Sequence, residues 1–136
     1  MILGRVPSER LDIARRGIEA YNGGDLATLA EFLHEDVVAE VPDGMPNAGV
    51  YRGHEGFAHM VMHWGEAWED FRIDIEELIE EREAVLAPVV QRGRGRGSGI
   101  ETTMTAVHLM RFRDGRVVFW RLCESLADAR LHAAEE

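Results

Sequence analysis

The stretch GHEGFAHMVMHWGEAWE, residues 53–69, separates two parts of this chain that differ in character. Its apolar residues recur at α-helical spacing and form one narrow stripe of Phe57, Met60, Val61, Trp64 and Trp68. The residues before it favour helices, whereas the residues after it favour strands. We therefore predict a helix over residues 53–69 that packs against a sheet through this stripe.

The residues before this stretch predict two more helices and a short strand. Ser8 is a suitable N-cap for the first helix, which the run Asn22-Gly23-Gly24-Asp25 should end. Asp25 is the expected cap of the second helix. Residues 37–41 favour a strand, and the Pro- and Gly-rich residues 42–49 favour a loop.

The residues after it predict strands over 71–77, 84–97, 100–113 and 117–124. Asp114-Gly115 is the expected hairpin turn between the last two strands, and residues 126–134 favour a short helix. Helices on one side of an antiparallel sheet make an α+β architecture. Because no linker is visible, we expect a single domain over residues 1–136.

Composition narrows the class of protein. The chain of 136 residues is 46% hydrophobic, which suffices for one packed core, and its net charge is −10. This charge disfavours nucleic acid and anionic membranes as partners. No run approaches the roughly 18 apolar residues of a membrane span, and the N-terminal residues lack the apolar region of a signal peptide. We therefore expect a cytoplasmic protein.

Cys123 is the only cysteine, so an internal disulfide is impossible. Its apolar neighbours Trp120, Leu122 and Leu126 indicate a small buried side chain. A catalytic thiol would need an identifiable activating base, and we see none beside it in the sequence.

Two further patterns suggest functions that we discount. His59 and His63 have a spacing that can hold zinc on a helix, but the His-Glu-x-x-His motif is absent and both lie opposite the aromatic stripe. We therefore expect a solvated face, with no metal and no cofactor. The Arg-Gly run over residues 92–97 lacks the interleaved aromatics of an RNA-binding tract. Its glycines should permit sheet curvature. Its arginines should either pair with acids among Glu76, Glu77, Glu80 and Glu81 or lie at a dimer interface.

Four short motifs occur in an order that resembles the SnoaL-like family of the nuclear transport factor 2-like superfamily. They are Tyr21-Asn22-Gly23-Gly24-Asp25, Tyr51-Arg52-Gly53, the glycine-rich residues 93–99, and residues 112–118. The resemblance implies a cone-shaped, curved antiparallel sheet wrapped on three N-terminal helices, with an internal pocket. It also implies a homodimer formed through the sheet. The family's relatives include steroid isomerases, limonene epoxide hydrolases, polyketide cyclases and members that only bind or associate.

The catalytic positions of two such relatives are not retained. By resemblance, the general base, tyrosine and acid of ketosteroid isomerases fall on Val41, Gly17 and His108. The arginine and two aspartates of limonene epoxide hydrolases fall on Val89, Gln91 and Leu122. The chain thus resembles the scaffold of both enzymes without their chemistry.

Strand alternation, placed by this resemblance, predicts which side chains face the pocket. The expected polar groups are Gln91, His108 and Glu124, and the expected ligand contacts are Trp64, Trp68, Met104, Trp120 and Leu122. A simple two-residue hairpin at Asp114-Gly115 would instead pair His108 with Arg121. This assignment of faces therefore requires a β-bulge near the hairpin.

Two functions fit such a pocket for a small apolar ligand. The first is a cofactor-independent isomerase, cyclase or hydrolase in which His108 is the acid or base, Glu124 its partner and Gln91 a donor to a carbonyl. The alternative is a non-catalytic ligand-binding or dimeric association domain. In that case His108 is a core or rim residue, Glu124 is solvated or caps the last helix, and Gln91 bonds backbone.

Overall fold

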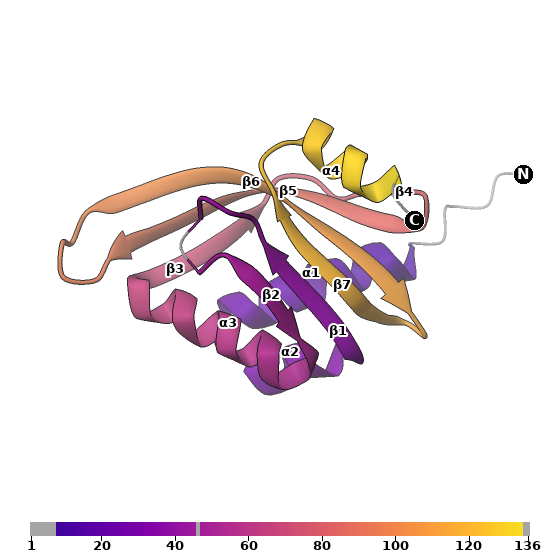
Figure 1. The fold of residues 1–136 in the computed structure, drawn as a ribbon, viewed down its shortest axis with the longest axis horizontal. Helices are drawn as coiled ribbons and strands as arrows, with labels where there is room; N and C mark the ends of the chain where they lie inside the picture. The colour runs from indigo at the N-terminus through magenta and orange to yellow at the C-terminus, as the bar shows by residue number, and fades with distance from the viewer. Residues whose placement is uncertain (1–7, 46, 135–136) are drawn as a thin grey trace, which may run out of the picture.

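A curved, mixed sheet is the frame of the molecule (Figure 1). The structure is a computed structural model that describes residues 8–45 and 47–134. Within these residues the strands are β1 (Leu33–Val41), β2 (Gly49–Arg52), β3 (Trp68–Ile75), β4 (Ile79–Glu81), β5 (Ala84–Gly95), β6 (Glu101–Arg113) and β7 (Arg116–Cys123). The helices are α1 (Glu9–Asn22), α2 (Leu26–Glu31), α3 (Gly53–Ala67) and α4 (Leu126–Ala134). The α+β fold class is confirmed.

The strands follow the order β2-β1-β7-β6-β5-β3, and β4 also pairs with β5. Strands β1 and β7 run parallel, whereas the other pairs are antiparallel. The expectation of an entirely antiparallel sheet was therefore wrong for this one pair. A parallel pair needs a long crossover connection, and the chain from α3 to β6 provides it.

Local capping explains where the first two helices begin. Ser8 Oγ accepts a hydrogen bond from the Leu11 backbone N–H at 3.4 Å, and Asp25 Oδ1 accepts one from Thr28 N–H at 3.1 Å. Between these helices Gly24 adopts a φ of 72°, a conformation that glycine reaches without strain. Both predicted caps are confirmed.

The predicted third helix is two residues too long at its end. It stops at Ala67, and Trp68 is already extended and pairs with Gly95 of β5. Tryptophan favours strands, and backbone pairing with β5 takes Trp68 and Glu69 out of the helix. Residues 49–52, expected to lie partly in a loop, form β2 at the edge of the sheet.

The hairpin of β6 and β7 contains the expected β-bulge. Its register shifts between Arg111 and Phe112, so that Met110 faces Trp120 and His108 faces Leu122. The bulge places these four side chains on one face of the sheet. The predicted assignment of faces is confirmed at this hairpin.

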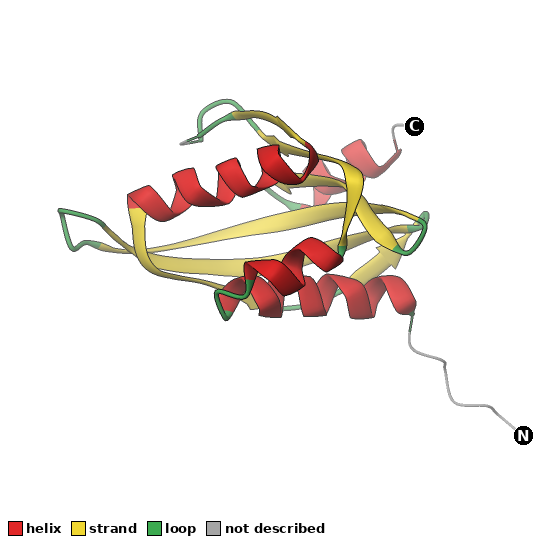
Figure 2. Cartoon of the chain, turned by 90° about the horizontal axis from the view of Figure 1, so that it is seen from below, coloured by secondary structure: helices red, strands yellow, loops and turns green. Residues whose placement is uncertain are grey.

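The sheet has two buried faces. The inner face carries residues that pack with α1, α2 and α3, including Val85, Ala87, Val89, Ala106, Met110 and Leu122. The outer face carries Ala84, Leu86, Val107, Leu109 and Cys123, which pack against Ala129 and Ala133 of α4. Figure 2 shows α1 and α2 lying together, with α3 apart from them. The predicted burial of Cys123 is confirmed, and burial raises its pKa to about 12.

The first four residues of the Arg-Gly run, Arg92 to Gly95, form the end of β5. A Cβ atom on Gly93 would come within 2.9 Å of the Phe71 ring, so this position needs glycine. Arg92 and Arg94 point to the other face, where Arg92 pairs with Asp74 at 3.0 Å and Arg94 pairs with Asp70. The expected glutamate partners were therefore wrong, because β3, which supplies both aspartates, is the strand that pairs with this part of β5.

Candidate functional site

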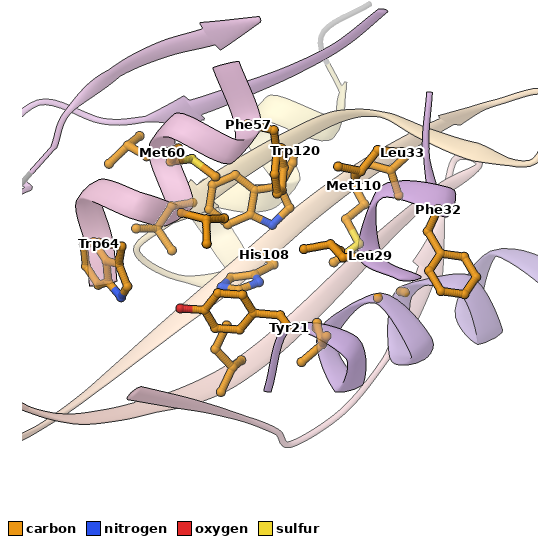
Figure 3. A pocket seen from close by; sticks show the side chains of 18 of the residues that line it. Tyr21, Leu29, Phe32, Leu33, Phe57, Met60, Trp64, His108, Met110 and Trp120 are labelled. Atoms are coloured by element: carbon orange, nitrogen blue, oxygen red, sulfur yellow. The ribbon is translucent and has the colours of Figure 1, made fainter. Parts of the chain in front are cut away.

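A cavity lies between the inner face of the sheet and helices α1, α2 and α3 (Figure 3). Its volume is about 110 Å³. Most of its lining is apolar, and includes Ile13, Ile18, Leu29, Phe57, Met60, Val61, Phe71, Met110 and Leu122. Its polar lining residues are Tyr21, Asn47, Trp64, Gln91, His108 and Trp120. Among the described residues, no aspartate, glutamate, lysine or arginine lines it.

His108 and Gln91 form the polar centre of this cavity. His108 on β6 is 3% exposed and Gln91 on β5 is 4% exposed. The distance between His108 Nε2 and Gln91 Oε1 is 2.8 Å. In the register of the two strands His108 faces Ala87, four positions from Gln91, so both side chains extend along the strands to meet.

Burial fixes the charge of His108. Desolvation lowers its pKa to about 4, so the ring is neutral at pH 7. A neutral imidazole has one N–H and one lone pair, and the Gln91 oxygen can only accept. Nε2 therefore carries the proton and donates to Gln91, and Nδ1 carries a lone pair. Nδ1 is buried and has no hydrogen-bond partner among the described residues.

Aromatic rings orient the imidazole from the inner face. Trp120 of β7 lies edge-on to His108, with ring centroids 5.0 Å apart and planes at 76°. Phe57 of α3 contacts Trp120 in the same edge-on manner at 6.4 Å. Such contacts hold rings in defined orientations. The imidazole is thus held on one side by an amide and on another by an aromatic edge.

Three further polar groups belong to residues that line the cavity. The Trp64 Nε1–H donor and the Asn47 Oδ1 acceptor are both buried without a hydrogen-bond partner among the described residues. Burial raises the pKa of Tyr21 to about 12, so its hydroxyl remains protonated at neutral pH. Figure 3 shows Tyr21, Trp64 and His108 around the same cavity, on α1, α3 and β6.

Five of the eight predicted site residues line the cavity: Gln91, His108, Trp64, Trp120 and Leu122. Trp68 does not line it. It packs instead against Trp64 and Phe71, with ring centroids 6.1 Å and 6.2 Å away. Met104 also lies outside the lining, because it is half-buried on the part of β6 that extends beyond His108 toward the hairpin with β5.

Glu124 does not meet His108. Strand β7 ends at Cys123, so Glu124 lies in the bend before α4 and is exposed to solvent. Its backbone N–H donates to the Asp128 carboxylate at 3.2 Å. The expected His108–Glu124 pair was wrong because the strand alternation that would turn Glu124 inward stops one residue too early.

Tyr21 and Asn47 were missed by reasoning from the sequence. Tyr21 continues the apolar face of α1 that includes Ala14 and Ile18, and this position already carried the signal of an inward-facing hydroxyl. Asn47 lies in a loop, where no periodicity indicates which way a side chain points.

The two histidines whose spacing suggested zinc are His59 and His63 of α3. Within residues 8–45 and 47–134, no group of three or more His, Cys, Asp or Glu residues could hold a metal ion. His59 and His63 are exposed on α3, and their rings contact each other at 4.5 Å. No described helix is long and apolar enough to cross a membrane.

Comparisons with known structures establish the class of fold. A nuclear transport factor 2-like protein of unknown function from Burkholderia pseudomallei matches with a TM-score of 0.80 and 25% identity, over 96% of this chain and all of that one. TerC, crystallised with polyporic acid, matches with a TM-score of 0.79 and 20% identity, over 95% of this chain and 100% of that one. The protein thus has a nuclear transport factor 2-like fold.

Sequence comparison places the chain within that class. The family model of the SnoaL-like domain matches residues 14–120, so the chain belongs to the SnoaL-like family. Aklanonic acid methyl ester cyclase DnrD from Streptomyces peucetius is 30% identical over 123 residues, which cover 81% of this chain and 80% of the cyclase. The family recognised from the four motifs is confirmed.

Proposed function

We propose that this protein is a cofactor-independent enzyme of the cyclase or isomerase type, which moves a proton on a small metabolite bound in the cavity. The observation that carries the proposal is His108, a buried neutral imidazole whose Nδ1 lone pair has no partner among the described residues of an apolar cavity. The similarity to a cyclase of the same family supports this reaction class.

His108 Nδ1 serves as the base in this reaction. It takes a proton from an enol hydroxyl of the substrate, or from a carbon next to a carbonyl. The Trp64 Nε1–H and the Tyr21 hydroxyl are the donors that stabilise the enolate oxygen. A histidine whose pKa is about 4 is a weak base. The two donors must therefore lower the free energy of the enolate enough for His108 to take the proton.

The proton returns to the product in both reaction types. In an isomerisation, protonated His108 delivers it to a different carbon of the same molecule. In a cyclisation, the enolate carbon attacks a second carbonyl carbon of the substrate and a C–C bond forms. The resulting alkoxide then takes the proton from Nδ1. Neither route needs an oxidant, a reductant or a second substrate.

The size of the cavity limits the substrate. A buried apolar cavity of roughly 150 Å³ holds one benzene molecule. The cavity here measures about 110 Å³ and has the same apolar character. The reacting part of the ligand that enters this space is therefore about one ring in size.

The proposal is tested with 3-cyclohexen-1-one, an uncharged one-ring ketone whose isomerisation to the conjugated enone is followed by ultraviolet absorbance. We expect the protein to accelerate this reaction over buffer. His108→Gln should abolish the acceleration while circular dichroism shows an unchanged fold. Trp64→Phe, which removes only a donor, should reduce it in part. A wild-type rate equal to buffer contradicts catalysis, and full activity in His108→Gln contradicts the role of His108.

A non-catalytic ligand-binding domain is the second candidate. It is favoured by the absence of any carboxylate among the described cavity-lining residues, and by Gly17, Val41, Val89 and Leu122 at positions where relatives are expected to carry catalytic groups. Under this function, ligands are recovered chemically unchanged after prolonged incubation, and substitution of His108 changes affinity only.

We also propose that two copies associate through the outer surface of the sheet. Helix α4 covers Leu86 and Leu109 on that surface, so the association must use the strands beyond α4. Sedimentation equilibrium is expected to give twice the chain mass. A monomer at high protein concentration contradicts the proposal.

A further inference from the structure

Gln91 does more than fill space in the cavity, because its hydrogen bond to His108 decides which ring nitrogen can accept. We infer that Gln91 is the specificity-determining residue. Because its amide oxygen accepts from His108 Nε2, Nδ1 is left as an acceptor, and the cavity selects an uncharged ligand whose hydroxyl or enol group donates to Nδ1. This inference rests on the proposed binding of a ligand in the cavity but does not depend on catalysis.

Gln91 sets the tautomer of His108. Gln91 Oε1 lies 2.8 Å from Nε2 and can only accept, which places the single ring proton on Nε2. The Nδ1 atom is fully buried and lacks a partner among the described residues. A buried acceptor without a hydrogen bond is costly, so a ligand that donates to it gains more than one that does not.

The described part of the cavity lining carries no charge to pair with a charged ligand. Every described residue that lines the cavity is uncharged at neutral pH, because Tyr21 is protonated and His108 is not. A carboxylate or an ammonium group would lose its hydration here without gaining an ion pair. The ligand that fits is therefore neutral.

One unpartnered donor and one unpartnered acceptor distinguish a ligand hydroxyl from a ligand carbonyl. Trp64 Nε1–H is an unpartnered donor in the same cavity wall, and Nδ1 of His108 is an unpartnered acceptor. A hydroxyl both donates and accepts, so it can use either atom. A ketone oxygen can only accept, and it leaves Nδ1 unsatisfied. The two atoms together favour an alcohol or enol over the corresponding ketone.

The test uses cyclohexanol and cyclohexanone, which match in size and differ in the ability to donate. Binding is measured by titration calorimetry, and the protonation of the His108 ring nitrogens by ¹⁵N NMR. In the wild type we expect a protonated Nε2, an unprotonated Nδ1 and about tenfold tighter binding of cyclohexanol. Cyclohexanecarboxylate should not bind.

Gln91→Met removes the accepting oxygen at similar volume. We expect the Nδ1–H tautomer to become populated and the preference for cyclohexanol to fall below about threefold. Trp64→Phe is the contrasting variant, because it removes the donor that a ketone oxygen needs and leaves Nδ1 unchanged. We expect it to weaken cyclohexanone at least as much as cyclohexanol, so that the preference stays at about tenfold or above.

The outcomes separate this inference from the proposed function. Equal or tighter binding of cyclohexanone by the wild type, or a protonated Nδ1, overturns the inference alone. An unchanged preference in Gln91→Met also overturns it. If neither ring compound binds the wild type, the cavity has no ligand of this size, and both the inference and the proposed function fail. The NMR result in the wild type stands even if Gln91→Met does not fold.

Discussion

The two faces of the sheet differ in how completely the neighbouring helices fill the space against them. On the outer face, Leu86, Leu109 and Cys123 pack against the alanines of α4, and these side chains are almost completely buried. On the inner face, the side chains of the sheet pack with three helices and leave a cavity of about 110 Å³. The alanines of α4 close over the outer face, whereas the side chains between the inner face and three helices leave space unfilled.

Each face also buries one titratable side chain, and the two differ in what they can do. Cys123 on the outer face has a pKa raised to about 12 by burial, so it remains an unreactive thiol. His108 on the inner face has a pKa lowered to about 4, so it remains an unprotonated imidazole with a lone pair in the cavity wall. Burial makes the thiol unreactive, whereas it keeps the imidazole unprotonated and therefore able to accept a hydrogen bond. Four predictions test this contrast between a closed face and an open one.

The largest expected effect is the loss of a leucine from the closed face. Leu109→Ala should lower the free energy of unfolding by about 4 kcal/mol, because the side chain is fully buried among tightly packed neighbours. Leu122→Ala on the cavity wall should cost clearly less, since part of that side chain already faces empty space. Urea unfolding of both variants measures the difference. Equal losses would contradict the contrast between the faces.

The second prediction concerns pH. The unfolded chain protonates His108 below about pH 6.5, whereas the folded chain resists protonation down to about pH 4. The unfolded state therefore binds more protons in this window, and stability falls as the pH drops from 6.5 to 4. The loss from this residue is about 3 kcal/mol, at roughly 1.4 kcal/mol for each pKa unit.

Urea unfolding between pH 7 and pH 4 measures this loss. His108→Gln is the control, because it lacks the titrating ring while other acid-sensitive groups remain. We expect a markedly shallower pH dependence in the variant. Parallel curves for the two proteins would show that His108 is not the source of the loss.

The third prediction enlarges one alanine on each side of the sheet. Ala129 of α4 and Ala14 of α1 are both buried and both helical, but only Ala14 lines the cavity. Ala129→Leu should destabilise the fold by about 2 kcal/mol through overpacking. Ala14→Leu should be nearly neutral, because its added atoms enter the cavity, and should abolish binding of cyclohexanol. Thermal unfolding and calorimetry give the two readouts, and similar destabilisation by both changes would refute the prediction.

The smallest effect is expected at Gly17 on the cavity wall. A Cβ atom there would meet only Leu29 Cδ1, at an ordinary distance of 3.8 Å. Gly17→Ala should therefore stabilise α1 by about 1 kcal/mol. Gly93→Ala is the contrasting control, because its Cβ atom would lie 2.9 Å from Phe71. A loss of stability at Gly17 would mean that the cavity wall tolerates no added atoms.

The candidate site was predicted correctly where local periodicity decides the direction of a side chain. Gln91, His108 and Leu122 were placed on the inner face by strand alternation, and the β-bulge that this required is present between Arg111 and Phe112. The same rule failed for Glu124 because alternation holds only within a strand, and β7 ends at Cys123. It failed for Trp68 because the backbone changes from helix to strand at that residue.

The sequence by itself determined the fold class, the caps of α1 and α2, the burial of Cys123 and the family, since capping groups, periodicity and ordered motifs are local features. Only the tertiary structure decided which polar atoms share the cavity. The hydrogen bond between Gln91 and His108 spans 17 positions of sequence, and Tyr21, Asn47 and Trp64 come from three other segments. The charge of His108 also follows from desolvation by all of these neighbours together, and no local pattern encodes it.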